Sequence, residues 1–128
     1  MPVNRKVIVD TCIWIEFFRS KSEISNRMKE LVSHDRVIVT GIILAELLQG
    51  VKGKQEKKSI ESIFNTMEYL EMTKGVWLET GVVSKKLRAL GKTVPLSDIS
   101  IACLAKQNGY PVFTIDKHFN EIQGIKLY

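Results

Sequence analysis

A short apolar stretch near the N-terminus constrains the fold of this chain more than any other feature. Residues 7–9 read Val-Ile-Val, Asp10 follows directly, and residues 11–19 are rich in apolar side chains. A strand with no polar position is typical of a parallel sheet, because helices cover both faces of such a sheet. We predict a strand over residues 6–9, a helix over residues 11–19, and Asp10 at the sheet edge where open α/β sheets bind ligands.

Further strands and helices alternate along the chain. Strands are expected over residues 37–40 and 112–115, with shorter ones over residues 70–73 and 125–127. Helices are expected over residues 22–33, 42–49, 53–69, 75–90 and 97–108, from the spacing of apolar residues and from glycines placed to end them, such as Gly50 and Gly109. This order predicts an α/β fold in one domain, with a central, mostly parallel, twisted sheet flanked by helices.

Composition indicates a soluble chain with one hydrophobic core. Of the 128 residues, 45% are hydrophobic and 26% are charged, which is ordinary for a globular domain. No apolar run approaches the roughly 20 residues that span a bilayer, and no targeting segment is recognisable. Cys12 and Cys103 lie in apolar surroundings, which favours buried free thiols in a reducing cytoplasm over a disulfide bond or a zinc site.

The charge of the chain favours approach to polyanions. The formal net charge is +5, which is compatible with a nucleic-acid partner and is also common in proteins without one. Lys85, Arg88 and Lys92 are spaced to share one helical face, so they are candidates for contacts with RNA phosphates. A solvated helix face is the alternative explanation for these three side chains.

Four acids occupy positions that the predicted fold brings together. Asp10 and Asp116 follow strands, Asp98 lies in the first turn of the last predicted helix, and Glu46 lies one turn into the helix after the second strand. Helices that connect parallel strands run antiparallel to them, so strand C-termini and helix N-termini share one sheet edge. We therefore expect the four carboxylates to face one crevice.

A crevice lined by four carboxylates predicts a cation site. Like charges a few ångström apart raise each other's pKa and strain the fold unless a cation neutralises them. Oxygen ligands suit Mg²⁺ or Mn²⁺, and such ions activate water and stabilise charge on a phosphodiester. The four acids therefore favour hydrolysis of a nucleic-acid backbone.

Each acid also has a purely structural explanation. Asp10 can cap the helix that follows it, and Asp98 can stabilise a helix start at which Ser97 serves as N-cap. Asp116 can form an Asx-type turn, and Glu46, in a helix that is apolar on nearly every side, can pair with a buried arginine or lysine. These alternatives stay open at the level of the sequence.

Each of the four acids lies in a short motif. The motifs are Val-Ile-Val-Asp-Thr at residues 7–11, Ile-Leu-Ala-Glu-Leu-Leu-Gln-Gly at 43–50, Leu-Ser-Asp-Ile-Ser-Ile-Ala at 96–102 and Thr-Ile-Asp-Lys-His-Phe at 114–119. In this order and spacing the chain resembles the PIN-domain ribonucleases, and especially the VapC-like toxins of type II toxin–antitoxin systems. The resemblance spans essentially the whole chain and implies a single PIN-like domain over residues 1–128.

The resemblance also implies an activity and a set of site residues. It implies a Mg²⁺- or Mn²⁺-dependent endoribonuclease in which Asp10, Glu46, Asp98 and Asp116 are both catalytic residues and metal ligands. Thr11 and Thr114 would hydrogen-bond the carboxylates or a bound water, although either could equally be an ordinary hydroxyl at a strand end. A non-catalytic PIN-like module that binds RNA or a protein is the alternative.

The partners and one departure from the family follow from the same resemblance. It implies a homodimer that is inhibited by a VapB-like antitoxin, which places a peptide in the active-site groove. Many relatives carry a second acid two residues after the last aspartate, where this chain has His118, so we expect fewer metal ligands near Asp116. The aromatic residues Trp14, Phe17 and Phe18 are expected in the core or in a dimer interface.

Overall fold

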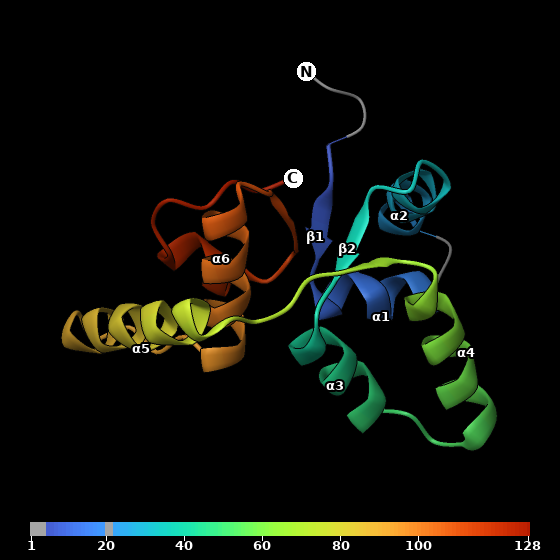
Figure 1. Cartoon of the computed structure of the whole chain (residues 1–128), viewed down its shortest axis with the longest axis horizontal. Helices are drawn as coiled ribbons and strands as arrows, with labels where there is room; N and C mark the ends of the chain where they lie inside the picture. The colour runs from blue at the N-terminus through green and yellow to red at the C-terminus, as the bar shows by residue number, and fades with distance from the viewer. Residues whose placement is uncertain (1–4, 20–21) are drawn as a thin grey trace.

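A computed structural model describes residues 5–19 and 22–128, and this part of the chain forms a four-stranded parallel sheet flanked by helices (Figure 1). The strands are β1 (Val7–Val9), β2 (Val37–Val39), β3 (Glu68–Tyr69) and β4 (Val112–Phe113). The helices are α1 (Thr11–Arg19), α2 (Glu23–Ser33), α3 (Gly41–Gln49), α4 (Lys54–Asn65), α5 (Lys74–Ala89) and α6 (Leu96–Asn108), followed by the 3₁₀ helix η1 (Lys117–Glu121). The predicted parallel α/β fold is confirmed.

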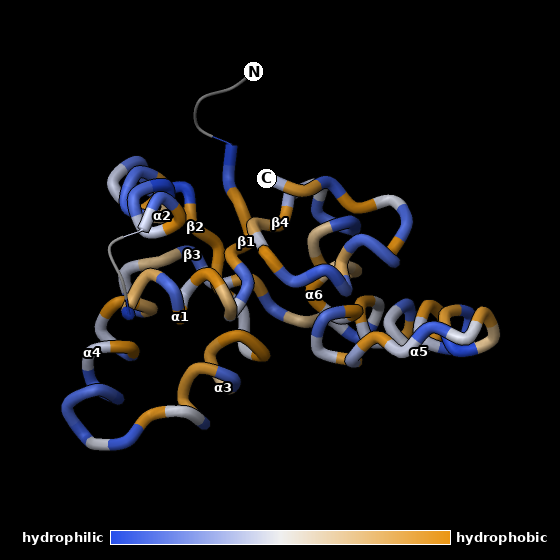
Figure 2. The backbone as a smooth tube through the Cα atoms, turned by 180° about the vertical axis from the view of Figure 1, so that it is seen from behind, coloured by the Kyte–Doolittle hydropathy of each residue, from blue (hydrophilic) through white to orange (hydrophobic). Residues whose placement is uncertain are grey.

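The two central strands lie at the middle of the hydrophobic core. The sheet order is β3-β2-β1-β4, so β1 pairs with β2 on one side and with β4 on the other, in parallel in both cases. Every residue of β1 and β2 is fully buried. Figure 2 shows the apolar residues gathered along these strands, with polar residues in the first turns of α4. The apolar run at residues 7–9 is therefore explained by burial on both faces of the sheet.

Local capping interactions determine where several helices begin and end. The Ser22 hydroxyl accepts the Ser25 N–H at the start of α2, and the Thr73 hydroxyl accepts the Val76 N–H at the start of α5. Gly109 ends α6 with a φ of 72°, a left-handed conformation that favours glycine. This is the position at which the sequence predicted a helix stop.

The predicted N-cap of α6 was wrong, and Gly50 ends α3 as predicted but not in the left-handed conformation of a C′ glycine. Ser97 is not an N-cap, because α6 begins at Leu96 and Pro95 stands at its N-cap. Proline loses nothing at a helix start, where its missing N–H would have no partner within the helix. Gly50 ends α3 with a right-handed φ of −94°, so its position does not require a glycine conformation.

The predicted lengths of the strands also needed correction. The third strand pairs with β2 at residues 68–69 rather than 70–73, and α4 ends at Asn65 rather than at 69. The last strand ends at Phe113, two residues earlier than predicted. Residues 125–127 contribute a single parallel bridge between Leu127 and Val112. Pairing with a neighbouring strand, which apolar patterns do not report, determines these limits.

The helix α5 extends away from the sheet and packs chiefly against α6 (Figure 1). Its outer side carries the exposed large apolar residues Trp77, Leu78 and Val82. Among the described residues no helix is long and apolar enough to cross a lipid bilayer.

We predict that Ile38→Ala lowers the free energy of unfolding by about 3 kcal/mol, because it leaves a cavity beside fully buried neighbours in the central strands. Denaturation with urea, followed by circular dichroism, measures this change. Leu78→Ala is the matched control, since Leu78 is 63% exposed, and it should cost less than about 0.5 kcal/mol. Equal costs for the two variants would contradict the position of Ile38 in the core.

Candidate active site

Two acids follow neighbouring strands at one edge of the sheet. β1 and β4 are parallel neighbours, and the backbone N–H of Asp10 donates to the carbonyl of Phe113 at 2.9 Å. The Asp10 side chain is buried, and its Oδ2 accepts hydrogen bonds from Thr114 Oγ1 at 2.8 Å and from Cys12 Sγ at 3.3 Å. The backbone N–H of Asp116 donates to the same Thr114 hydroxyl at 3.0 Å. Thr114 thus connects the two strand-end acids.

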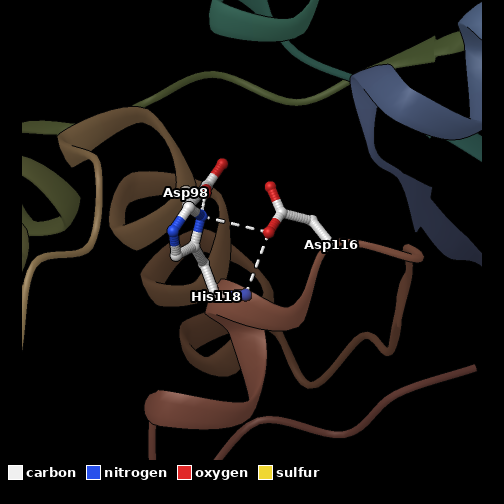
Figure 3. Close-up of side chains that lie close together, drawn as sticks. All are labelled: Asp98, Asp116 and His118. Atoms are coloured by element: carbon white, nitrogen blue, oxygen red, sulfur yellow. Dashed lines mark hydrogen bonds and ion pairs between the residues drawn. The ribbon is translucent and has the colours of Figure 1, made fainter.

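Asp98, Asp116 and His118 form a tight group beside this edge (Figure 3). His118 Nδ1 lies 3.2 Å from Asp98 Oδ2 and 3.0 Å from Asp116 Oδ1. One possible metal-ligating atom from each side chain lies within 4.8 Å of the other two. From the sequence, His118 was predicted only to stand in place of an acid, although a histidine two residues after an aspartate is itself a possible metal ligand.

Glu46 approaches the site from α3. Thr11 Oγ1, in the first turn of α1, donates to Glu46 Oε1 at 2.7 Å, so the two helices present the glutamate together. Although α3 is apolar on nearly every side, only Ile43 and Leu47 are buried, and the helix lies at the surface against α1 and α4. In residues 5–19 and 22–128 no lysine or arginine forms an ion pair with Glu46.

The negative charges of the other three acids all act on the pKa of Asp98. Its pKa is raised to about 6, first by burial and then by the negative charges of Asp116 and Asp10, with a smaller contribution from Glu46. His118 acts in the opposite direction. The pKa of Asp10 is also raised, mainly by burial, while its hydrogen bonds from Thr114 and Cys12 oppose this shift. Asp10 and Glu46 lie outside the tight group but close enough for their charges to act on it.

The donors in this group fit a divalent cation. Asp98 Oδ2 is buried and accepts no hydrogen bond from the described residues, and His118 Nδ1 lies 3.2 Å from it. Two carboxylates and one imidazole lie within reach of a common point. Carboxylate oxygens and imidazole nitrogens are ordinary ligands of divalent metal ions in proteins.

Asp116 and Asp98 also have structural roles at the starts of η1 and α6. Asp116 Oδ1 accepts the His118 backbone N–H at 2.9 Å at the start of η1, as an Asx-type turn requires. Asp98 lies in the first turn of α6, where a negative charge is favourable, but it is not the N-cap. The turn at Asp116 also places His118 opposite Asp98, so the structural role and the site geometry are not in competition.

The predicted basic face is only partly present. Lys85 and Arg88 are exposed on α5 and line a shallow hollow of about 340 Å³ together with Leu96, two residues before Asp98. Lys92 does not share this face, because α5 ends at Ala89 and Lys92 Nζ pairs with Glu121 Oε2 at 2.7 Å. The prediction that the three side chains lie on one helical face was therefore wrong for Lys92.

A groove between α1, α3 and α4 leads up to Glu46. It has a volume of about 560 Å³ and is lined by the apolar residues Ile15, Phe18, Leu47 and Ile60, by the charged residues Arg19, Glu46, Lys52 and Glu56, and by Gly50. Trp14 lies in the core as expected, whereas Phe18 is 43% exposed and contributes to this groove. The two thiols are free, with Cys103 buried and Cys12 half-buried at the site.

Comparison with known proteins identifies one family and several relatives. The family model described as PIN domain matches residues 7–125. "Ribonuclease VapC1" of Methanocaldococcus jannaschii is 24% identical over 126 residues, which cover 96% of this chain and 87% of that protein. The structure of VapBC-1 from nontypeable Haemophilus influenzae is similar with a TM-score of 0.80 and 24% identity, covering 95% of this chain and 96% of the other. The structure of a toxin–antitoxin complex from Klebsiella pneumoniae is similar with a TM-score of 0.76 and 16% identity. The match covers 94% of this chain and 95% of the other.

We predict that Asp98→Asn stabilises the metal-free protein at neutral pH but not in acid. The folded protein holds the Asp98 proton up to about pH 6, whereas the unfolded chain releases it near 3.8. The folded state therefore binds more protons in this window, and the contribution of Asp98 to the free energy of unfolding is lost as the pH rises from about 4 to about 6.

Urea denaturation of both proteins in EDTA, from pH 4 to pH 7.5, measures this effect. The variant should gain on the order of 2 kcal/mol relative to wild type across this range, and most of the change should come between pH 4 and pH 6. A difference between the two proteins that does not vary with pH would contradict the raised pKa.

Proposed function

This chain belongs to the PIN domain family, and from that premise we propose that it is one PIN-like domain over residues 1–128 that acts as a Mg²⁺- or Mn²⁺-dependent endoribonuclease, the toxin of a toxin–antitoxin pair. The observation that carries the proposal is the convergence of four acids. The negative charges of Asp116, Asp10 and Glu46 all raise the pKa of Asp98. A ribonuclease activity is in keeping with the printed name of the M. jannaschii relative.

The four acids are proposed to hold the catalytic cation and to surround the scissile phosphate. When bound, such an ion lowers the pKa of a water ligand and stabilises the negative charge that develops on the phosphodiester. Thr11 orients Glu46, and Thr114 orients Asp10, each through one carboxylate oxygen. The ion or an attacking water would bind the carboxylate groups that these two hydroxyl groups orient.

RNA needs positive charge near so acidic a site. Lys85 and Arg88 are proposed to contact phosphates that flank the cleaved bond, since the hollow that they line reaches the start of α6. Lys92 stays a predicted phosphate contact, because its ion pair with Glu121 lies at the surface and RNA phosphates can replace the carboxylate. Contacts of this kind neutralise the backbone of the substrate and carry no base sequence.

The partner is proposed to be a VapB-like antitoxin that lies in the groove between α1, α3 and α4. The groove combines apolar side chains, among them Ile15 and Phe18, with Glu46 of the acidic site. A partner segment with apolar side chains and one basic side chain would fill the groove and neutralise the acids, and it would block the substrate at the same time. The similar fold from K. pneumoniae is described as a toxin–antitoxin complex, which supports this type of partner.

A homodimer and a cytoplasmic location complete the proposal. The homodimer stays a prediction from the resemblance. A cytoplasmic location agrees with an RNA substrate and with two free thiols. The alternative, a PIN-like module that binds RNA or a protein without cutting, predicts the same fold but no metal-dependent cleavage.

We predict that Asp98→Asn and Asp10→Asn each lower the rate of RNA cleavage by at least 100-fold while the fold is retained, because each removes a proposed metal ligand. The purified protein, freed of any partner, is incubated with single-stranded and structured RNAs in Mg²⁺, Mn²⁺ or EDTA, and the products are separated by electrophoresis. Leu78→Ala, a change at a 63% exposed side chain that is not one of the proposed site residues, is the control. Cleavage that persists in EDTA or in either aspartate variant would contradict the proposal.

Binding of the ion should also be visible without any substrate. At a concentration ten times the dissociation constant, Mg²⁺ or Mn²⁺ should stabilise the folded wild type by about 1.4 kcal/mol, or a few degrees in melting temperature. The double variant Asp10→Asn/Asp98→Asn should lose most of this shift. Equal shifts in the two proteins would count against a shared metal site.

A further inference from the structure

The histidine between Asp98 and Asp116 carries an inference about which cation the site selects. Figure 3 shows the His118 ring directed toward both carboxylates, with Nδ1 as the nearest atom. Asp98 belongs to α6, whereas Asp116 and His118 belong to the turn that begins η1. Two separate elements therefore bring a nitrogen donor and two oxygen donors to one place.

We propose that His118 is a metal ligand through Nδ1 and that it makes this a mixed nitrogen and oxygen site, which prefers Mn²⁺ and other first-row transition ions over Mg²⁺. The inference rests on the proposed metal-dependent function and adds to it the selection among cations. Mg²⁺ takes oxygen ligands and retains its waters, whereas transition ions bind imidazole readily. Replacing one oxygen ligand with a nitrogen ligand therefore shifts the selectivity of the site from Mg²⁺ toward Mn²⁺ and other transition ions.

The spacing of the three donors agrees with one shared ion. The candidate donor atoms lie within 4.8 Å of one another. Two ligands on opposite sides of a Mg²⁺ or Mn²⁺ ion are about 4.2 Å apart, so the side chains need to move by less than about 1 Å. The His118 side chain is 46% exposed, which leaves the ring free to make such a movement.

The oxygen of Asp98 supplies a second, independent observation. Oδ2 is buried and accepts no hydrogen bond from the part of the chain that the structure describes, although His118 Nδ1 lies 3.2 Å away. Almost all buried polar atoms in folded proteins have a partner, so this oxygen calls for an explanation. A cation between Oδ2 and Nδ1 would satisfy both atoms.

The position of the ring is supported by hydrogen bonds around it. The His118 backbone N–H donates to Asp116 Oδ1, and the Asp116 N–H donates to the Thr114 hydroxyl. Nδ1 faces the acids, so the proton of the neutral ring can reside on Nε2 and leave the Nδ1 lone pair for the ion. The competing explanation is a charged ring that acts only as a counter-ion for the two acids.

Dissociation constants for Mn²⁺ and Mg²⁺, measured by calorimetry, separate the two explanations. His118→Asp replaces the nitrogen donor with an oxygen donor, and His34→Ala is the matched control because it removes the other of the two histidines. The ratio of the Mg²⁺ constant to the Mn²⁺ constant should fall at least tenfold in His118→Asp and stay unchanged in His34→Ala. A ratio that is the same in all three proteins overturns the inference, because a counter-ion affects both cations alike.

Pulsed electron paramagnetic resonance of bound Mn²⁺ gives a direct reading on the wild-type protein. A nitrogen coupling should be present in wild type and in His34→Ala and absent in His118→Asp. If His118→Asp does not fold, His118→Gln takes its place. Absence of the nitrogen coupling from Mn²⁺-loaded wild type overturns the inference whatever the variants do.

The same samples distinguish failure of this inference from failure of the proposed function. Metal-dependent RNA cleavage together with an unchanged ion ratio removes His118 as a ligand and leaves the nuclease in place. A wild-type protein that binds neither ion and cuts no RNA removes both proposals.

Discussion

Negative charge held inside the protein is the constraint on which the rest of this structure depends. Burial and the neighbouring acids raise the pKa of Asp98, and burial raises that of Asp10, so the fold holds both carboxyl groups in surroundings that disfavour their charged forms. The fully buried strands β1 and β2 supply the apolar contacts that offset this cost. Sites of this kind trade some folding stability for an arrangement that binds a ligand or a metal ion.

The support for the acids comes from the first residues after the sheet edge. Thr11 fixes Glu46, Thr114 connects Asp10 with the segment that leads to Asp116, and the turn at η1 presents His118. None of these contacts requires a long loop, because the C-termini of parallel strands and the N-termini of the connecting helices lie at the same edge of the sheet. The sheet topology therefore brings the acids together, and the hydroxyl groups of Thr11 and Thr114 orient two of them.

Most of the architecture could be predicted from the sequence, because β-branched runs and apolar spacing report burial directly. The convergence of the acids could be predicted because it follows from parallel strand order alone. The orientation of His118 could not, since it depends on the turn that Asp116 makes with its own side chain. Lys92 was misplaced because helical spacing was extended past the end of α5, where Gly91 adopts a φ of 76°. Both His118 and Lys92 thus lie at backbone turns, whose conformation the apolar pattern does not report.

The strand order has a consequence for the chain while it is being synthesised. β1 pairs with β4, so Asp10 and Asp116 become neighbours only after the 105 residues between them have been joined and β4 has docked beside β1. Asp98 and His118 also belong to the last third of the chain. A ribosome that makes this protein therefore carries an incomplete acidic centre until the segment with Asp116 and His118 has been synthesised, because pairing between distant segments is a late event in folding. The order of elements along the chain thus delays assembly of the site until β4 and η1 can dock beside β1.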